Sequence, residues 1–209
     1  TLLKTLEEPP PGSMFVLLSE SMRFIPETIV SRCRVVRLQN LEPEVLSNRL
    51  VDQGVDSEDA LWLARRCWGS PGLAERLADM DLPAVNQRLL RRLGRLRTAD
   101  NFELSDGLES LARDHGEGAT DVRDLIQEIL ECIVVYYRDL ALAALREEPD
   151  LFNASAVEQV GAEAAGRHPD DFVERAELVL DTMDAIAANG NVRLQLDHLF
   201  TQLGRRHAG

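Results

Sequence analysis

The feature that constrains the fold most is a long run of apolar residues at the spacing of an α-helix. Between residues 121 and 147, side chains at i, i+3, i+4 and i+7 are apolar: Val122, Leu125, Ile126, Ile129, Ile133, Tyr137, Leu140 and Ala144. This spacing places them on one face of a helix. The opposite face carries charged residues: Arg123, Asp124, Glu128, Glu131 and Arg138. The segment predicts an amphipathic helix of several turns, with Thr120 as N-cap, that packs against other helices.

The rest of the chain after Asn40 is also expected to be helical. Helix stops and caps at Gly54, Asp56, Gly69 and Ser70-Pro71 predict three short helices that form a small bundle at about 41–80. Apolar periodicity predicts further helices at 83–97, 105–113, 155–166, 170–189 and 192–207. The expected fold class is therefore mostly α, with an all-α bundle over residues 83–209.

The first forty residues have a different pattern. The apolar runs at 14–18 and 33–38 are typical of β-strands, the first buried on both faces and the second at or near an edge. A short helix is expected to start at Pro26, and another to end before Pro9. Helix–strand–helix–strand in 40 residues cannot form a closed sheet alone. We therefore expect the closing part of an α/β unit and a chain that is a fragment of a longer protein.

Charge and cysteine content exclude several classes of protein. The 209 residues include 36 acidic and 23 basic side chains, for a formal net charge of −13. Such a field repels phosphate, which argues against binding of nucleic acid or an anionic membrane by the whole surface but still allows a local basic patch. Cys33, Cys67 and Cys132 are widely spaced, which excludes a disulfide scaffold and a cysteine-based zinc site and fits a reducing cytoplasm. No apolar run approaches the ~18 residues of a membrane span, so we expect no membrane contact. We also expect a cytoplasmic location, which the cysteine content favours, and no bound metal.

No complete active site is recognisable in the chain. The P-loop pattern GxxxxGK[ST] is absent, as are the hydrolase pattern GxSxG and the zinc pattern HExxH. The four histidines are far apart in sequence and are interpreted as solvated side chains. We therefore expect no cofactor to bind within this chain, and no enzymatic activity can be assigned to it alone.

The segment 83–97 holds five arginines and no acidic residue, which is unusual in so acidic a chain. Arg88, Arg92 and Arg95 are expected to share one helical face. Two interpretations stay open. The arginines either form a solvated face that pairs with acidic neighbours, or they contact the DNA backbone or an acidic partner.

Three blocks near the start of the chain resemble the bacterial DNA polymerase III clamp-loader family of AAA+ proteins, which load the sliding clamp in DNA replication. The blocks are residues 2–10 (LLKTLEEPP), 15–18 (FVLL) and 25–33 (IPETIVSRC). The resemblance implies three parts: the C-terminal part of an AAA+ α/β domain at 1–40, a three-helix lid at 41–82, and a helical collar for oligomerisation at 83–209.

Within the family, the chain is most similar to the delta-prime type of subunit. ATP-hydrolysing members carry a lid arginine at the position of Gly72, in the stretch Gly69-Ser70-Pro71-Gly72. Ser19 and Glu20 stand where those members have threonines, and an acidic side chain there would repel a nucleotide. Residues 136–140 (YYRDL) and 189–197 (NGNVRLQLD) also resemble delta-prime blocks.

The resemblance changes the interpretation of Ser31-Arg32-Cys33. From the residues alone, Arg32 is either a surface arginine beside a strand or an arginine finger. The family implies the second role, in trans, with ATP and Mg²⁺ bound by a neighbouring ATPase subunit; Ser31 and Cys33 flank the finger and Lys4 is an accessory contact. The implied partners are gamma/tau and delta subunits, with the sliding clamp and primer–template DNA reached through the complex. Two alternatives are an ATP-hydrolysing gamma/tau-type subunit and a purely structural helical scaffold.

Overall fold

The computed structural model describes Thr5, Glu8 and residues 10–19, 21–94, 101–116 and 118–207. Through these ranges the regular structure is helical and no strand occurs, which confirms the expected mostly α fold class. The chain divides into two compact units, residues 1–40 and residues 41–209. The assignment of an AAA+ part, a lid and a collar stays a prediction.

In the first unit the two predicted strands are wrong. The segments 14–18 and 33–38 have no regular structure, and Met14, Val16 and Leu18 are 87%, 75% and 89% exposed. A strand needs a neighbouring strand for its backbone groups, and a buried apolar strand also needs a covering layer. The described residues supply neither. The regular elements of this unit are the short helices η1 (Met22–Phe24) and α2 (Glu27–Val30). The helix expected before Pro9 falls mostly outside the described residues.

The second unit begins with three short helices at the places that the caps predict. They are α3 (Pro43–Asp52), α4 (Ser57–Arg66) and α5 (Pro71–Asp79). Asp56 caps α4, because its side chain accepts a hydrogen bond of 2.9 Å from the backbone N–H of Glu58. Gly54 and Gly69 have φ values of 96° and 76°, so each ends its helix in a left-handed turn that glycine adopts without strain.

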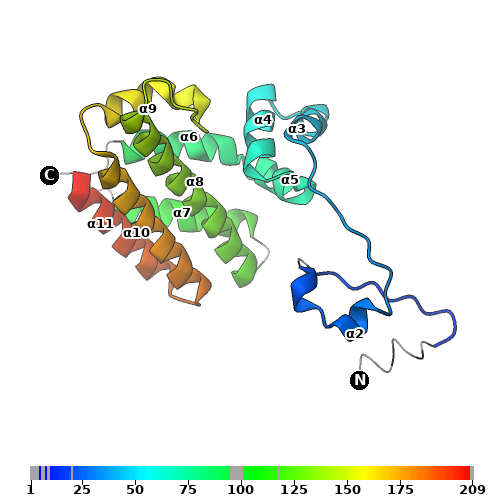
Figure 1. Ribbon diagram of the computed structural model, residues 1–209. Helices are drawn as coiled ribbons and strands as arrows, with labels where there is room; N and C mark the ends of the chain where they lie inside the picture. Colours follow the sequence, from blue (N-terminus) through cyan, green and yellow to red (C-terminus); the bar gives the residue numbers. More distant parts are fainter. Residues whose placement is uncertain are drawn as a thin grey trace. The chain divides into compact units, whose positions relative to one another are not determined.

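The longest helix, α8 (Ala119–Leu145), lies at the centre of the second unit (Figure 1). Around it pack α6 (Leu82–Leu93), α7 (Asn101–His115), α9 (Val157–Ala164) and α10 (Pro169–Ala187). The last helix, α11 (Val192–His207), packs on α7 and α10, and the short turn η3 (Ala154–Ala156) precedes α9. The predicted apolar face of α8 is confirmed, since Leu125, Ile126 and Ile129 are fully buried. Its N-cap is Gly118 and not Thr120.

The two blocks that resemble delta-prime subunits have structural roles in this unit. Asp139 is fully buried, and its carboxylate accepts hydrogen bonds from the backbone N–H groups of Phe152 and Asn153, at 3.1 and 2.9 Å. Asn189 ends α10 in a left-handed conformation, with φ 65°. The side-chain oxygen of Asn191 caps α11 by accepting from the N–H of Leu194 at 3.0 Å. These blocks therefore fix loops and helix ends.

A membrane-spanning helix needs about 20 consecutive, predominantly apolar residues. None of the helices in the described ranges combines the length and the apolar character needed to cross a bilayer.

Candidate functional site

Arg32 directly follows the short helix α2. Pro26 opens this helix, with the φ of −55° that its ring enforces. The helix then closes in a series of turns: the N–H of Ser31 donates to Glu27 O at 2.9 Å, and the N–H of Arg32 donates to Ile29 O at 3.1 Å. This local hydrogen bonding fixes the backbone that carries Arg32.

The side chain of Arg32 is exposed and lies over the carboxyl end of α2. Its Nη1 donates to the carbonyl oxygen of Thr28 at 2.8 Å and to Ser31 Oγ at 3.4 Å. Ser31 Oγ donates to the same Thr28 carbonyl at 3.3 Å. Carbonyls at the end of a helix carry partial negative charge, so a guanidinium is favoured there. The arrangement holds a cation at the surface of the first unit.

The other residues singled out around Arg32 differ in what the structure shows. Cys33 is partly buried and directly follows the arginine. Lys4 and Glu20 lie outside the described residues. Ser19 makes local contacts, with its Oγ donating to Ser21 O at 3.0 Å. The flanks Ser31 and Cys33 are therefore placed beside Arg32, while the predicted contact from Lys4 stays a prediction.

Gly72 lies in the first turn of α5, in the second unit. A Cβ added to it would meet no atom within 4 Å. There is room for a Cβ, so steric crowding does not require glycine at this position. Glycine has no side chain with which to contact a nucleotide.

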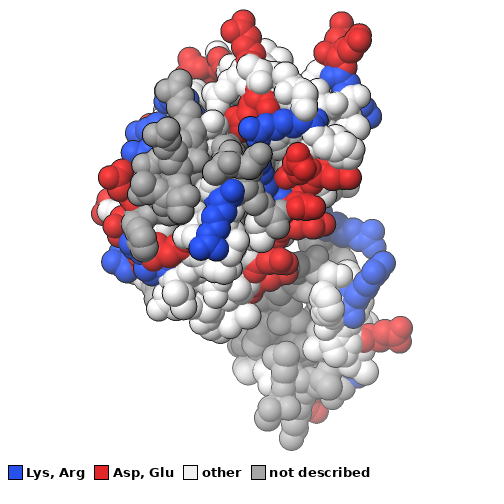
Figure 2. Space-filling view, turned by 90° about the vertical axis from the view of Figure 1, so that its left-hand side faces the viewer, with Lys and Arg blue, Asp and Glu red and all other residues white. Residues whose placement is uncertain are grey.

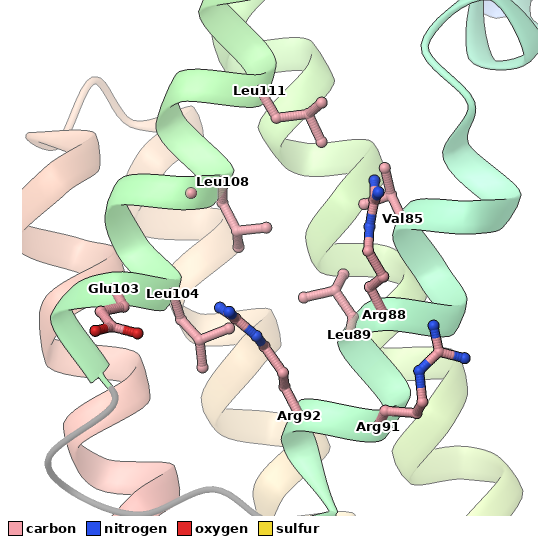
Figure 3. A pocket seen from close by; sticks show the side chains of 10 residues that line it. Val85, Arg88, Leu89, Arg91, Arg92, Glu103, Leu104, Leu108 and Leu111 are labelled. Carbon is pink, nitrogen blue, oxygen red and sulfur yellow. The ribbon is translucent and has the colours of Figure 1, made fainter.

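A second candidate site is a groove between α6 and α7, both of which pack on α8. We call it the α6–α7 groove; its volume is about 680 Å³. Its apolar lining comes from both helices: Val85, Leu89, Leu104, Leu108 and Leu111. Arg88, Arg91 and Arg92 line it from α6, and Glu103 lines it from α7. Figure 3 shows Arg92 extending from α6 toward Leu104 on the opposite helix.

Three arginines of this groove are exposed, and none of them forms an ion pair within the described ranges. Arg88 and Arg92 line the same groove, whereas Arg95 lies outside the described residues. Acidic and basic side chains are interspersed on the face of the molecule shown in Figure 2. Carboxylates are therefore plentiful on this surface, yet none of those in the described ranges forms an ion pair with Arg88, Arg91 or Arg92.

Two cysteines are excluded as nucleophiles by their surroundings. Burial raises the pKa of Cys67 and of Cys132 to about 12, so both thiols stay protonated near neutral pH. Within the described ranges, no three His, Cys, Asp or Glu side chains come together as a potential metal site.

Comparison with known proteins gives a consistent set of relatives. The family described as DNA polymerase III, delta subunit, matches residues 1–42. DNA polymerase III subunit delta' of Bacillus subtilis (strain 168) is 25% identical over 218 residues, which cover 97% of this chain and 60% of that relative. Subunit tau of the same organism is 28% identical over 163 residues, or 68% of this chain and 28% of that protein.

A shorter match involves subunit gamma of DNA polymerase III from Buchnera aphidicola subsp. Acyrthosiphon pisum (strain APS). It is 40% identical over 62 residues, which cover 28% of this chain and 17% of the relative. The chain thus spans 60% of the length of the delta' relative and smaller shares of the other two. The resemblance inferred from the blocks at residues 2–33 is supported, because the chain is similar to subunits of DNA polymerase III, and the match to delta' extends over 97% of this chain at 25% identity.

Proposed function

We propose that this chain acts as a delta-prime-like clamp-loader subunit that hydrolyses no ATP itself and supplies Arg32 in trans to ATP on a neighbouring subunit. The observation that carries the proposal is the position of Arg32. Its exposed guanidinium is fixed by the Thr28 carbonyl at the end of α2, within the stretch that the family model matches.

The chemistry of phosphoryl transfer explains why such a group would matter. Negative charge develops on the transferred phosphoryl oxygens and on the leaving oxygen, and a fixed guanidinium stabilises it. An arginine finger of this kind contributes about 10³–10⁵ to the rate. The neighbouring subunit would hold ATP and Mg²⁺, and this chain would contribute the guanidinium of Arg32. Lys4 would be an accessory contact.

The absence of hydrolysis in cis is inferred from the lid. ATP-hydrolysing members of the family place an arginine at the position of Gly72, which here offers no charge. A Cβ at Gly72 would meet no atom within 4 Å, so the fold does not require glycine there, which supports the inference of a missing contact. Residues 41–82 would act as the lid and residues 83–209 as the collar, joined to gamma/tau and delta subunits. The assembly would load the sliding clamp onto primer–template DNA in the cytoplasm, away from the membrane.

The test uses a loader assembled from the full-length protein and its gamma/tau and delta partners. Arg32→Ala and Arg32→Lys should leave assembly intact and lower DNA-stimulated ATP hydrolysis, by up to ~10³ at the site that Arg32 serves. Lysine should fail because it lacks the planar fork of donors. Arg34→Ala, an exposed arginine two residues on, is the matched control. A wild-type rate for Arg32→Ala would exclude the finger.

A gamma/tau-type, ATP-hydrolysing subunit is the second candidate, because relatives named tau and gamma also match the chain. Equilibrium binding of ATP to the isolated full-length protein separates the two candidates. Saturable binding together with hydrolysis by the isolated protein would favour the gamma/tau type. Loss of assembly in collar variants, combined with an Arg32→Ala rate equal to wild type, would favour a purely structural scaffold.

A further inference from the structure

We propose that the α6–α7 groove is a docking site for an acidic, amphipathic helical segment of a partner protein. The proposal goes beyond the role of Arg32, which lies in the other unit of the chain. It depends on the shape of the groove, on its apolar lining and on the arginines along one side.

The groove exists because α6 and α7 each pack on α8. The apolar side chains of both helices point toward the space between them, as Leu89, Leu104 and Leu108 do in Figure 3. A volume of about 680 Å³ accommodates several side chains of a bound segment. Apolar anchors at i, i+3 and i+4 of a partner helix fit a groove of this kind.

Charge determines which segment is favoured. Three arginines lie on the α6 side and a single carboxylate, Glu103, lies on the α7 side. The chain has 13 more acidic than basic side chains, yet no described carboxylate pairs with Arg88, Arg91 or Arg92. Exposed arginines of this kind complement carboxylates along the polar face of a partner helix. This complementarity would raise the rate of association and fix the register of the bound helix.

The apolar lining favours a protein over a nucleic acid. Leu104 and Leu108 are only 3% and 5% exposed, so the apolar contact that the groove offers comes mainly from the partly exposed Leu111. A phosphate backbone would engage the arginines but would gain nothing from that leucine, whereas an amphipathic helix uses both surfaces at once. The net charge of −13 also repels a polyanion from most of the surface. A short acidic segment requires only a local basic patch.

Gly107 provides a direct way to close the groove. It lines the groove from α7, and a Cβ added there meets no atom within 4 Å. Gly107→Trp should therefore fill the groove from a position that tolerates a side chain. Gly107→Ala is the matched control, because it adds one methyl group and favours the helix.

The test measures fluorescence anisotropy of a labelled 18-residue peptide built from Leu, Ala and Glu, with leucines at i, i+3, i+4 and i+7. The full chain should bind it, and affinity should fall about tenfold or more with Arg88→Glu/Arg92→Glu and with Gly107→Trp. Binding should also weaken as salt rises. Arg65→Glu/Arg146→Glu changes net charge equally, outside the groove, and should bind like the wild type, as should Gly107→Ala.

Two results would overturn the proposal. One is an equal loss of affinity in Arg88→Glu/Arg92→Glu and in its charge-matched control, which would show that binding depends on net charge alone. The other is tight binding of a 20-base-pair DNA duplex that depends on Arg88 and Arg92 while the peptide binds no better than a scrambled peptide of the same composition. Circular dichroism of each variant confirms folding before the comparison. Because Arg32 takes no part in this assay, its outcome is separate from that of the ATPase test.

Discussion

Arg66 of α4 is buried between two carboxylates of α8, one of which belongs to Glu128. Its Nη2 lies 2.8 Å from Glu128 Oε2 and 2.8 Å from Glu131 Oε2, and its side chain is only 4% exposed. The same nitrogen donates to the backbone oxygen of Glu128 at 3.1 Å. Through this contact, α4 of the predicted lid is tied to α8 of the predicted collar.

Replacing Arg66 by methionine should destabilise the protein strongly. The variant keeps the length of the side chain but leaves the partly buried carboxylate of Glu128 without its cation, a loss of about 2–4 kcal/mol in the free energy of unfolding. Urea unfolding followed by circular dichroism measures it. Arg65→Met, at the exposed neighbouring position, is the control and should stay within ~0.5 kcal/mol of wild type. Equal stability of the two variants would show that the buried ion pair contributes nothing.

The effect of Arg66→Met should depend on pH. Burial raises the pKa of Glu128 above its ordinary value, and the charge of Arg66 opposes that rise. Without Arg66 the pKa of Glu128 in the folded state should rise further. A raised carboxyl pKa means that the folded state takes up its proton first as pH falls, so folding is favoured on acidification toward the unfolded pKa near 4.5.

The stability deficit of Arg66→Met relative to wild type should therefore shrink between pH 7 and about pH 4.5. Urea unfolding at several pH values measures this change. The double variant Arg66→Met/Glu128→Gln has no carboxyl at position 128 and is the control. The stability deficit of this double variant should depend little on pH. If the deficit changes with pH equally in the single and double variants, the effect comes from a group other than Glu128.

The sequence predicts the helices well and the partners of their polar residues poorly. The apolar period of α8 and the caps at Asp56 and Ser70 depend on near neighbours in the chain, so local pattern is sufficient. Arg66 looks like a surface residue by the same pattern, because its partners are 62 and 65 residues away. Trp68 shows the opposite difference between local pattern and structure. Its helical spacing places it on the apolar face of α4, yet it is 77% exposed, because the chain leaves the helix there with a φ of 49°.

The candidate sites also differ in how far local sequence predicts them. Arg32 can be located from the sequence because a local motif carries it, although the expected neighbouring strand over 33–38 does not form. The shared face of Arg88 and Arg92 follows from their spacing of four residues. The opposite side of the α6–α7 groove comes from α7, and no local pattern indicates which helix will lie there.

Asp139 should be among the most sensitive positions of the second unit. It is fully buried, and its Oδ2 accepts from both the backbone N–H and the side-chain Nδ2 of Asn153, each at 2.9 Å. Asp139→Ala would leave buried donors around Asn153 unsatisfied, at a cost of about 2–4 kcal/mol in stability. Thermal unfolding measures it, with the exposed Asp124→Ala as control. A melting temperature equal to that of the control would mean that the loop at 152–153 is fixed by other contacts.

The three cysteines should differ sharply in their reaction with iodoacetamide. The thiolate is the reactive form, and burial raises the pKa of Cys67 and Cys132 to about 12, so both thiols stay almost entirely protonated at pH 8. Both side chains are also almost fully buried, whereas Cys33 is only partly buried. Mass spectrometry of the native protein should therefore find Cys33 alkylated first, and Cys67 and Cys132 alkylated only after urea unfolds the second unit.

Arg66→Met should speed labelling of both buried cysteines, because weakening the contact between α4 and α8 increases the population of open states in which they are accessible. Native Cys132 that reacts as fast as Cys33 would contradict the buried position of this thiol in α8.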